Sequence, residues 1–114
     1  MPDSKSEILQ GTLDLMVLKT LDAMGPLHGF GIARRIEHLS KEALQVNQGT
    51  IYLCLIRLVQ KGWISAEWGT SENNRKAKFY SISKAGRNQL AAKTENWERV
   101  AGTIGRMLRL ATRR

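Results

Sequence analysis

The 114-residue chain predicts a mostly α-helical fold with a small β-hairpin, arranged as a winged helix-turn-helix that continues into a long C-terminal helix. Three segments between residues 9 and 62 carry apolar residues at helical spacing, and two segments between residues 64 and 82 alternate apolar with polar residues. From residue 84 onward apolar residues recur every seven positions, as in helices that pair. We therefore divide the chain into a winged-helix unit over residues 1–83 and a C-terminal dimerisation helix over residues 84–114.

The first two helices are predicted from apolar spacing and from the residues that end them. Apolar residues recur every three or four positions over residues 9–24, and Gly25-Pro26 then caps and stops that helix. The same spacing over residues 32–39 defines a second helix of about three turns.

The third helix is the most informative segment, because its two faces differ in chemistry. Asn47 is a favourable N-cap, and Lys61-Gly62 is a favourable end. At about 100° per residue, the residues expected to face inward are Ile51, Leu55, Leu58 and Val59, and those expected to face outward are Gly49, Thr50, Leu53, Arg57 and Gln60. Short uncharged groups at the start of the outward face permit close approach to the base edges of a nucleic acid.

The hairpin follows, with strands near residues 64–68 and 78–82 and a polar, turn-rich tip over residues 69–76. The alternation predicts that Trp68 points inward, and we expect Trp63 and Trp68 to serve core or edge packing.

The final helix is predicted from Ser83, its N-cap, to about Ala111. Its apolar seam predicts a homodimer, with dimerisation residues Leu90, Trp97, Val100, Ile104 and Met107. Lys93 interrupts the seam, so the first part of this helix either joins the seam weakly or packs back on the first helix.

The charge balance predicts a polyanionic partner. Eighteen Lys and Arg against ten Asp and Glu give a net charge of +8 and a pI near 10.2, which favours nucleic acid first and an anionic membrane surface second. One basic group is in the wing, at Arg75, Lys76 and Lys78, and such a loop fits along a phosphate backbone. The other is five arginines from Arg99 onward without an acid, and solvated surface charge is the competing interpretation for each group.

Other classes of protein find little support. Cys54 is the only cysteine, which excludes an internal disulfide and favours a reducing compartment, with the thiol buried or half-buried. No segment resembles a signal peptide or a membrane span, so we expect a cytoplasmic protein with no membrane partner. His28 and His38 lack companions at metal-ligand spacing, Gly29-Phe30-Gly31 lacks the features of a dinucleotide loop, and no nucleophile has a plausible base. We expect no metal, no cofactor and no enzymatic activity.

Four motifs, taken in order, resemble the PadR family of prokaryotic transcriptional regulators over roughly residues 8–110. They are Gln10-Gly11-Thr12-Leu13-Asp14-Leu15, Gly25-Pro26-Leu27-His28-Gly29-Phe30-Gly31-Ile32, Gly49-Thr50-Ile51-Tyr52, and Glu67-Trp68-Gly69 with Phe79-Tyr80-Ser81-Ile82-Ser83-Lys84-Ala85-Gly86. The resemblance, to the short subfamily with one C-terminal helix, implies a dimeric winged-helix repressor that binds a double-stranded DNA operator. In some members a small aromatic or drug-like compound at the dimer interface releases the DNA.

The resemblance also implies site residues. It places DNA-contacting groups at the start of the third helix, on Asn47, Gln48, Thr50 and Tyr52, with Arg57 reaching a phosphate further along. Asn47 is equally explained as a helix cap, and Arg34 and Arg35 either flank the groove or form an ordinary exposed face. Trp97 matches a tryptophan that stacks on planar ligands in multidrug-binding relatives, and ordinary dimer packing is the competing explanation.

Two residues depart from the family pattern. Leu53 stands where a proline is common, so we expect a more regular third helix and an outward side chain that meets a thymine methyl or alters the approach to the groove. Phe30 stands where tyrosine is frequent, and the missing hydroxyl removes one expected phosphate contact.

The sequence thus predicts a homodimeric DNA-binding transcriptional regulator, a repressor by resemblance, with half-sites about one helical turn, roughly 34 Å, apart. Two alternatives remain: a winged-helix protein-interaction scaffold without DNA binding, and an aromatic-ligand sensor that barely binds DNA.

Overall fold

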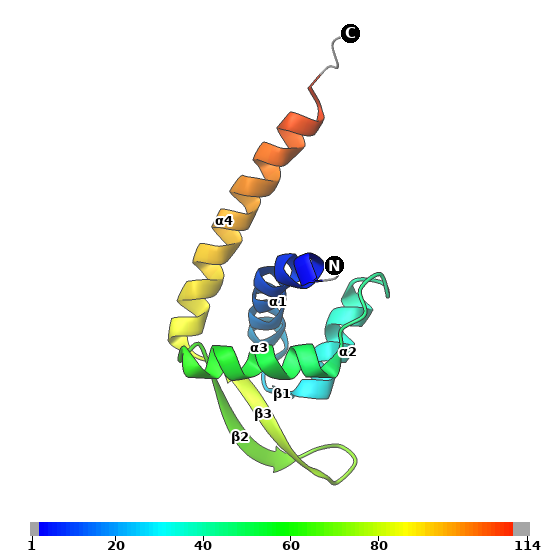
Figure 1. Cartoon of the computed structure of the whole chain (residues 1–114). Coiled ribbons are helices and arrows are strands. Elements are labelled where there is room, and N and C mark those ends of the chain that lie inside the picture. Colours follow the sequence, from blue (N-terminus) through cyan, green and yellow to red (C-terminus); the bar gives the residue numbers. More distant parts are fainter. Residues whose placement is uncertain (1–2, 111–114) are drawn as a thin grey trace.

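The computed structural model describes residues 3–110, with side chains from residue 11 onward (Figure 1). The elements in chain order are α1 (Asp3–Met24), β1 (Leu27–His28), α2 (Gly29–Leu39), α3 (Gln48–Gln60), β2 (Ile64–Thr70), β3 (Lys76–Ile82) and α4 (Lys84–Leu108). These helices and the small antiparallel sheet confirm the predicted class, a mostly helical winged helix-turn-helix. The first helix starts before the predicted Leu9, and the predicted seam residue Ala111 lies outside the described residues.

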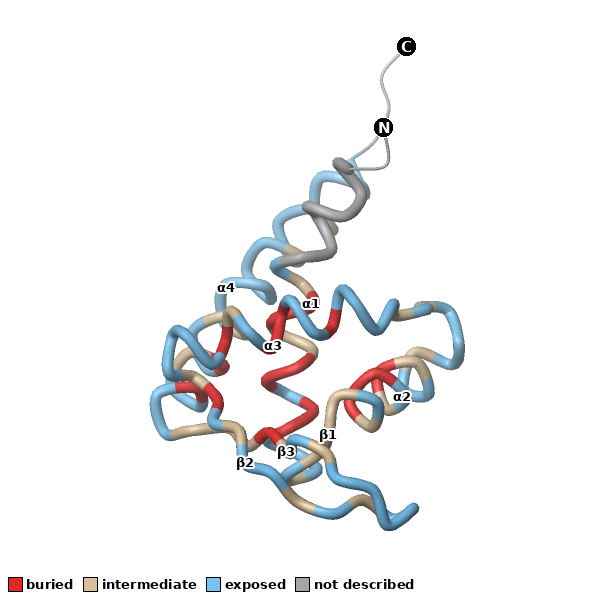
Figure 2. The backbone as a smooth tube through the Cα atoms, turned by 60° about the horizontal axis from the view of Figure 1, so that its bottom comes forward, coloured by how far each residue is buried: buried red, intermediate tan, exposed pale blue. Residues whose placement is uncertain are grey.

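The hydrophobic core forms around α1, which contacts α2, α3, α4 and β3. Val17 and Leu18 of α1 are completely buried, and Figure 2 shows buried positions where α1, α2 and α3 face one another. Among the described residues, no helix combines the length and the apolar character needed to cross a bilayer.

The buried face of α3 consists of Ile51, Cys54, Leu55 and Leu58. This spacing is one face of a helix with 3.6 residues per turn. The prediction that Val59 faces inward was wrong, because its side chain is 38% exposed. Cys54 faces inward instead. Contacts between α3 and α1 set this orientation of the helix, and the spacing of apolar residues within α3 carries no information about them.

The sheet has the strand order β1-β3-β2, with every pair antiparallel. The hairpin pairs Ile64 with Ile82 at its base and Thr70 with Lys76 near its tip. The strand β1 was not predicted, because two residues are too few to show an alternating pattern. It pairs with the middle of β3 and thereby fixes the start of α2 against the wing.

Trp68 was predicted to point into the core, and this prediction was wrong, because 66% of the residue's surface is exposed. The predicted alternation of faces along β2 is confirmed, because Ile64, at the base of the same face, is buried. The hairpin, however, extends beyond the helices in Figure 1, so the core no longer covers this face near the tip. Strand alternation predicts the face of a residue but not whether anything covers that face.

The wing leads directly into α4 through a tight junction. The Ser83 hydroxyl accepts a hydrogen bond from the Gly86 amide at 3.0 Å, which confirms Ser83 as the N-cap, and it donates one to the Gly62 carbonyl at 2.7 Å. The Ser83 amide also donates to the Trp63 carbonyl at 3.0 Å. A Cβ atom at Gly86 would overlap that same Trp63 oxygen, so only glycine fits there. The first turn of α4 is therefore held against the end of α3.

The first part of α4 packs on its own domain. Leu90, predicted to be a dimerisation residue, is buried in the core of the single chain, and the Lys93 Nζ lies 5.2 Å from the centre of the Trp63 ring. Of the two interpretations of this segment, packing against the protein's own helices is therefore correct. Farther along, Figure 1 shows α4 extending as an arm away from the other elements.

We predict that Gly86→Ala lowers the free energy of unfolding by about 1–3 kcal/mol, because the added methyl displaces the Trp63 backbone. Urea denaturation measures this difference. Gly102→Ala is the matched control, since the same change on the exposed part of α4 meets only the end of the Arg106 side chain at an ordinary contact distance of 3.9 Å and should stabilise the helix by about 0.5–1 kcal/mol. Equal effects of the two substitutions would contradict the prediction.

Candidate nucleic-acid interface

The start of α3 is capped and exposed. The Asn47 side-chain oxygen accepts hydrogen bonds from the amides of Gly49 at 2.7 Å and Thr50 at 3.2 Å, so its predicted capping role is confirmed. Gln48 and Thr50 are exposed beside it. Tyr52 and Leu53 are exposed one turn farther along; Leu53 was predicted for the outer face, and the resemblance placed Tyr52 among the DNA-contacting residues.

Arg57 was predicted to point outward, but its side chain lies against α1. Its Nη2 lies 2.6 Å from Oδ1 of Asp14 on α1, and only 29% of its side chain is exposed. The Asp14 side chain is 9% exposed, so its charge needs a partner inside the protein. The two residues are far apart in the sequence, and no local pattern links them. Arg57 therefore joins α3 to α1 in the structure, and Asp14 is a residue that sequence reasoning missed.

Cys54 donates a hydrogen bond from its Sγ to the same Asp14 oxygen, at 3.1 Å. Burial, together with this hydrogen bond and the charge of Asp14, raises the pKa of the Cys54 thiol well above its ordinary value. The thiol therefore stays protonated and unreactive, which agrees with its prediction as a buried structural cysteine. One carboxylate thus holds two side chains of α3.

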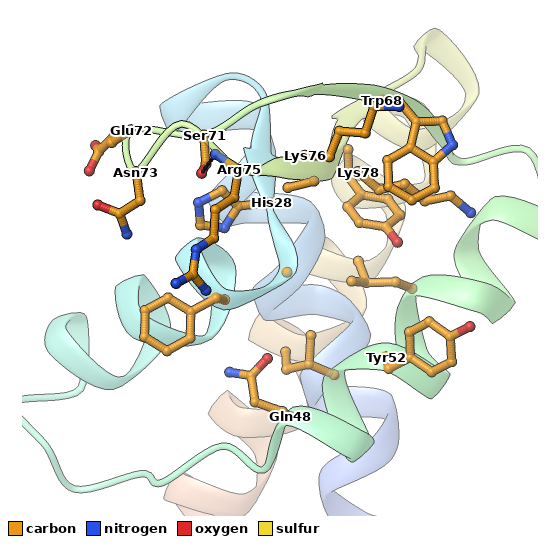
Figure 3. A pocket seen from close by; sticks show the side chains of 16 residues that line it. His28, Gln48, Tyr52, Trp68, Ser71, Glu72, Asn73, Arg75, Lys76 and Lys78 are labelled. Carbon is orange, nitrogen blue, oxygen red and sulfur yellow. Dashed lines mark hydrogen bonds between the residues drawn. The ribbon is translucent and has the colours of Figure 1, made fainter.

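The wing cations Arg75, Lys76 and Lys78 are exposed and line a groove of about 680 Å³. Figure 3 shows Gln48 and Tyr52 of α3 across this groove from the wing residues. The structure therefore brings together five of the predicted DNA-binding residues. Asn47 and Thr50 lie outside this groove and line a smaller cavity near α1.

The start of α2 forms another side of the groove. The Nδ1 atom of His28 accepts a hydrogen bond from the Gly31 amide at 3.0 Å, so His28 is the N-cap of α2. Histidine is an uncommon cap, so residue type alone did not predict this role. No group of three or more His, Cys, Asp or Glu side chains within the described part of the chain is arranged to hold a metal ion.

Glu37 positions the turn between α2 and α3. Its Oε2 accepts a hydrogen bond from the Val46 amide at 2.9 Å, just before the Asn47 cap, and its Oε1 lies 3.3 Å from Nη1 of Arg34. Arg34 is thus paired on the surface of α2. Sequence reasoning missed Glu37, because a contact between residues nine positions apart, across the turn that follows α2, leaves no periodic signal.

The exposed part of α4 carries the remaining predicted residues. Trp97, Val100, Ile104 and Met107 are all exposed along this arm. Trp97 also lines an apolar groove of about 490 Å³ with residues of three helices, namely Leu15, Met16, Ile36, Leu39 and Leu90.

The helical core, the cationic wing and the uncharged start of α3 define a winged helix-turn-helix protein. The pattern described as the transcriptional regulator PadR-like family matches residues 17–92, and the chain belongs to this family. This confirms the resemblance found in the sequence. Members of the family are transcriptional regulators and not enzymes, in agreement with the prediction.

Known proteins are similar along most of the chain. A transcriptional regulator from Clostridium thermocellum is 25% identical with a TM-score of 0.79, and the match covers 88% of this chain and 96% of that one. A PadR-like transcriptional regulator from Bacillus cereus shares the fold at 23% identity, with a TM-score of 0.78 and coverage of 92% and 99%. An uncharacterised protein of Lysinibacillus sphaericus is 27% identical over 100 residues, 88% of this chain and 91% of that protein.

We predict an energetic coupling between Asp14 and Arg57 of about 1–3 kcal/mol in a double-mutant cycle of D14A and R57A, measured by urea denaturation. The reason is that either single substitution leaves a mostly buried charge without its partner. A cycle of R34A and E37A serves as the control. That pair is more exposed, and its coupling should be about 0.2–0.5 kcal/mol. Similar couplings in both cycles would rule out the assigned role of Asp14.

Proposed function

We propose that the protein is a homodimeric, sequence-specific DNA-binding repressor. The observation that carries this proposal is the shared groove, in which the exposed start of α3 faces the wing cations. Base edges are read by short polar and aromatic groups, and phosphates are held by Lys and Arg. Gln48, Thr50 and Tyr52 supply the first kind of group, and Lys76 and Lys78 belong to the second.

In this proposal, α3 enters the major groove and the wing follows the neighbouring phosphate backbone. A dimer then presents two copies of α3 to successive major grooves, so the half-sites lie about one helical turn, roughly 34 Å, apart. Leu53 lies on the exposed face of α3, where it is available to contact a thymine methyl. We place this activity in the cytoplasm, where such an operator is accessible.

The dimer interface in this proposal is the arm of α4. Trp97, Val100, Ile104 and Met107 form an exposed apolar stripe at the spacing of a coiled-coil seam. Exposed apolar surface of this kind is stabilised when a second helix covers it, and a second copy of this chain offers the same seam. Leu90 is no longer part of the proposed interface, because it is buried within its own chain.

We also propose an aromatic effector that controls the repressor. The apolar groove beside Trp97 supports this step, since it joins α1, α2 and α4 and an indole ring at its edge stacks well on a planar compound. Such a ligand would shift α4 relative to the DNA-reading helices. The scaffold alternative needs no DNA contact at all, so binding experiments separate the two functions.

We predict that the protein binds duplexes selected from a random DNA pool, with a log-log salt slope of about −5 for a dimer that neutralises about three phosphates per subunit. Lys76→Ala should weaken binding to every sequence and make the slope less steep by about two, one for each subunit. Filter binding across a salt series measures both quantities. A protein that retains its fold but binds no duplex would favour the scaffold alternative.

We predict that Ile104→Lys converts the dimer into a monomer near the chain mass of 12.8 kDa, because it places a charge in the apolar stripe. Sedimentation equilibrium gives the mass. Gly102→Lys adds the same charge two residues earlier, on the opposite side of the heptad from the seam, and should leave the dimer intact. A wild-type monomer, or equal masses for the two variants, would disprove the proposed interface.

A further inference from the structure

Three large aromatic side chains line the wing groove although each is mostly exposed. Phe30 of α2 is 61% exposed, Tyr52 of α3 is 59% exposed and Trp68 of β2 is 66% exposed. Leaving such rings in water forgoes the stability that burial would provide. Their convergence from three elements on one groove marks a binding surface rather than scattered surface residues.

The charges around these rings identify the kind of occupant. Arg75, Lys76 and Lys78 line the groove, and Glu72 is the one carboxylate among its lining residues. Lys78 pairs with Trp68 across the hairpin, and its Nζ lies 5.7 Å from the centre of the indole ring. The groove thus offers a cation for binding an anion and an aromatic ring for an apolar contact side by side, at Lys78 and Trp68. A strand of DNA has both complementary features, phosphates beside sugars and base edges.

Figure 3 shows how these groups are distributed. Trp68 and Tyr52 lie toward one end of the groove, and Arg75 and Asn73 lie toward the other. A strand that passes between α3 and the wing therefore meets cations along the wing and aromatic rings beside them.

We propose that one strand of the bound duplex runs through this groove and that the Trp68 ring packs on its sugar and base edge. Trp68 thereby supplies a part of the affinity that does not depend on salt, because an uncharged ring releases no counterions. This inference rests on the proposed DNA-binding function and adds an aromatic contact to it. Phe30 and Tyr52 line the same path.

The fold does not depend on Trp68. The buried residues of the hairpin are Ile64 and Tyr80, and the indole ring lies beyond them near the tip. Substitution of Trp68 is therefore a clean test of binding, since the thermal unfolding temperature should stay close to that of the wild type.

The experiment compares wild-type protein with Trp68→Ala and Trp68→Phe on a selected duplex across a salt series. Trp68→Ala should weaken binding about 5- to 100-fold at every salt concentration, while the salt slope stays unchanged. Trp68→Phe keeps an aromatic face and should recover most of the affinity. Ser65→Ala, on the opposite face of β2, is the matched control and should bind like the wild type.

The possible failures are distinguishable. If the wild type binds no duplex, the proposed function is wrong and this inference falls with it. If the wild type binds and Trp68→Ala binds equally well, only the aromatic contact is wrong. A reduced salt slope in Trp68→Ala would also overturn it, because the ring would then act only by holding Lys78. Stronger competition by single-stranded DNA than by duplex would exclude a duplex strand as the occupant.

Discussion

The carboxylate of Asp14 sets the orientation of α3, and the proposed reading surface depends on that orientation. A largely buried charge cannot be left without partners, so Asp14 draws Arg57 and Cys54 of α3 toward α1. A helix fixed at these two side chains cannot rotate about its axis without breaking both contacts. The opposite face, with Gln48 and Tyr52, is therefore held toward the wing groove. The chemistry of the inner face determines which residues the outer face offers.

Much of the fold follows from local patterns in the sequence. Helical spacing, the Asn47 and Ser83 caps and the alternation of the hairpin are all properties of neighbouring residues, and the structure confirms them. The wrong directions of Val59, Arg57 and Trp68 have a common cause. Each depends on whether a distant part of the chain is present to cover or to pair with the side chain, and periodicity carries no such information.

The candidate nucleic-acid interface, like the fold, was predictable from the sequence only in part. The wing cations follow from charge composition, and the outward start of α3 follows from helix geometry. The groove between them does not, because its walls come from α2, α3 and the wing, and because β1 and the His28 cap are too short or too unusual to recognise. Leu90 shows the same limit, since a heptad repeat does not reveal whether its first position packs on a partner or within its own chain.

The junction at Ser83 and Gly86 gives α4 the properties of a lever. Its base is fixed by hydrogen bonds and by close contact with the Trp63 carbonyl, and 25 residues of helix extend from it. Beyond Leu90, which is packed in the core, the helix continues as an arm to Leu108; at 1.5 Å per residue this arm is roughly 27 Å long, so a tilt of about 10° moves its far end by roughly 5 Å. That displacement exceeds the spacing of one base pair along DNA, about 3.4 Å. A small tilt of this arm is thus magnified into a change in position on the scale of a base-pair step.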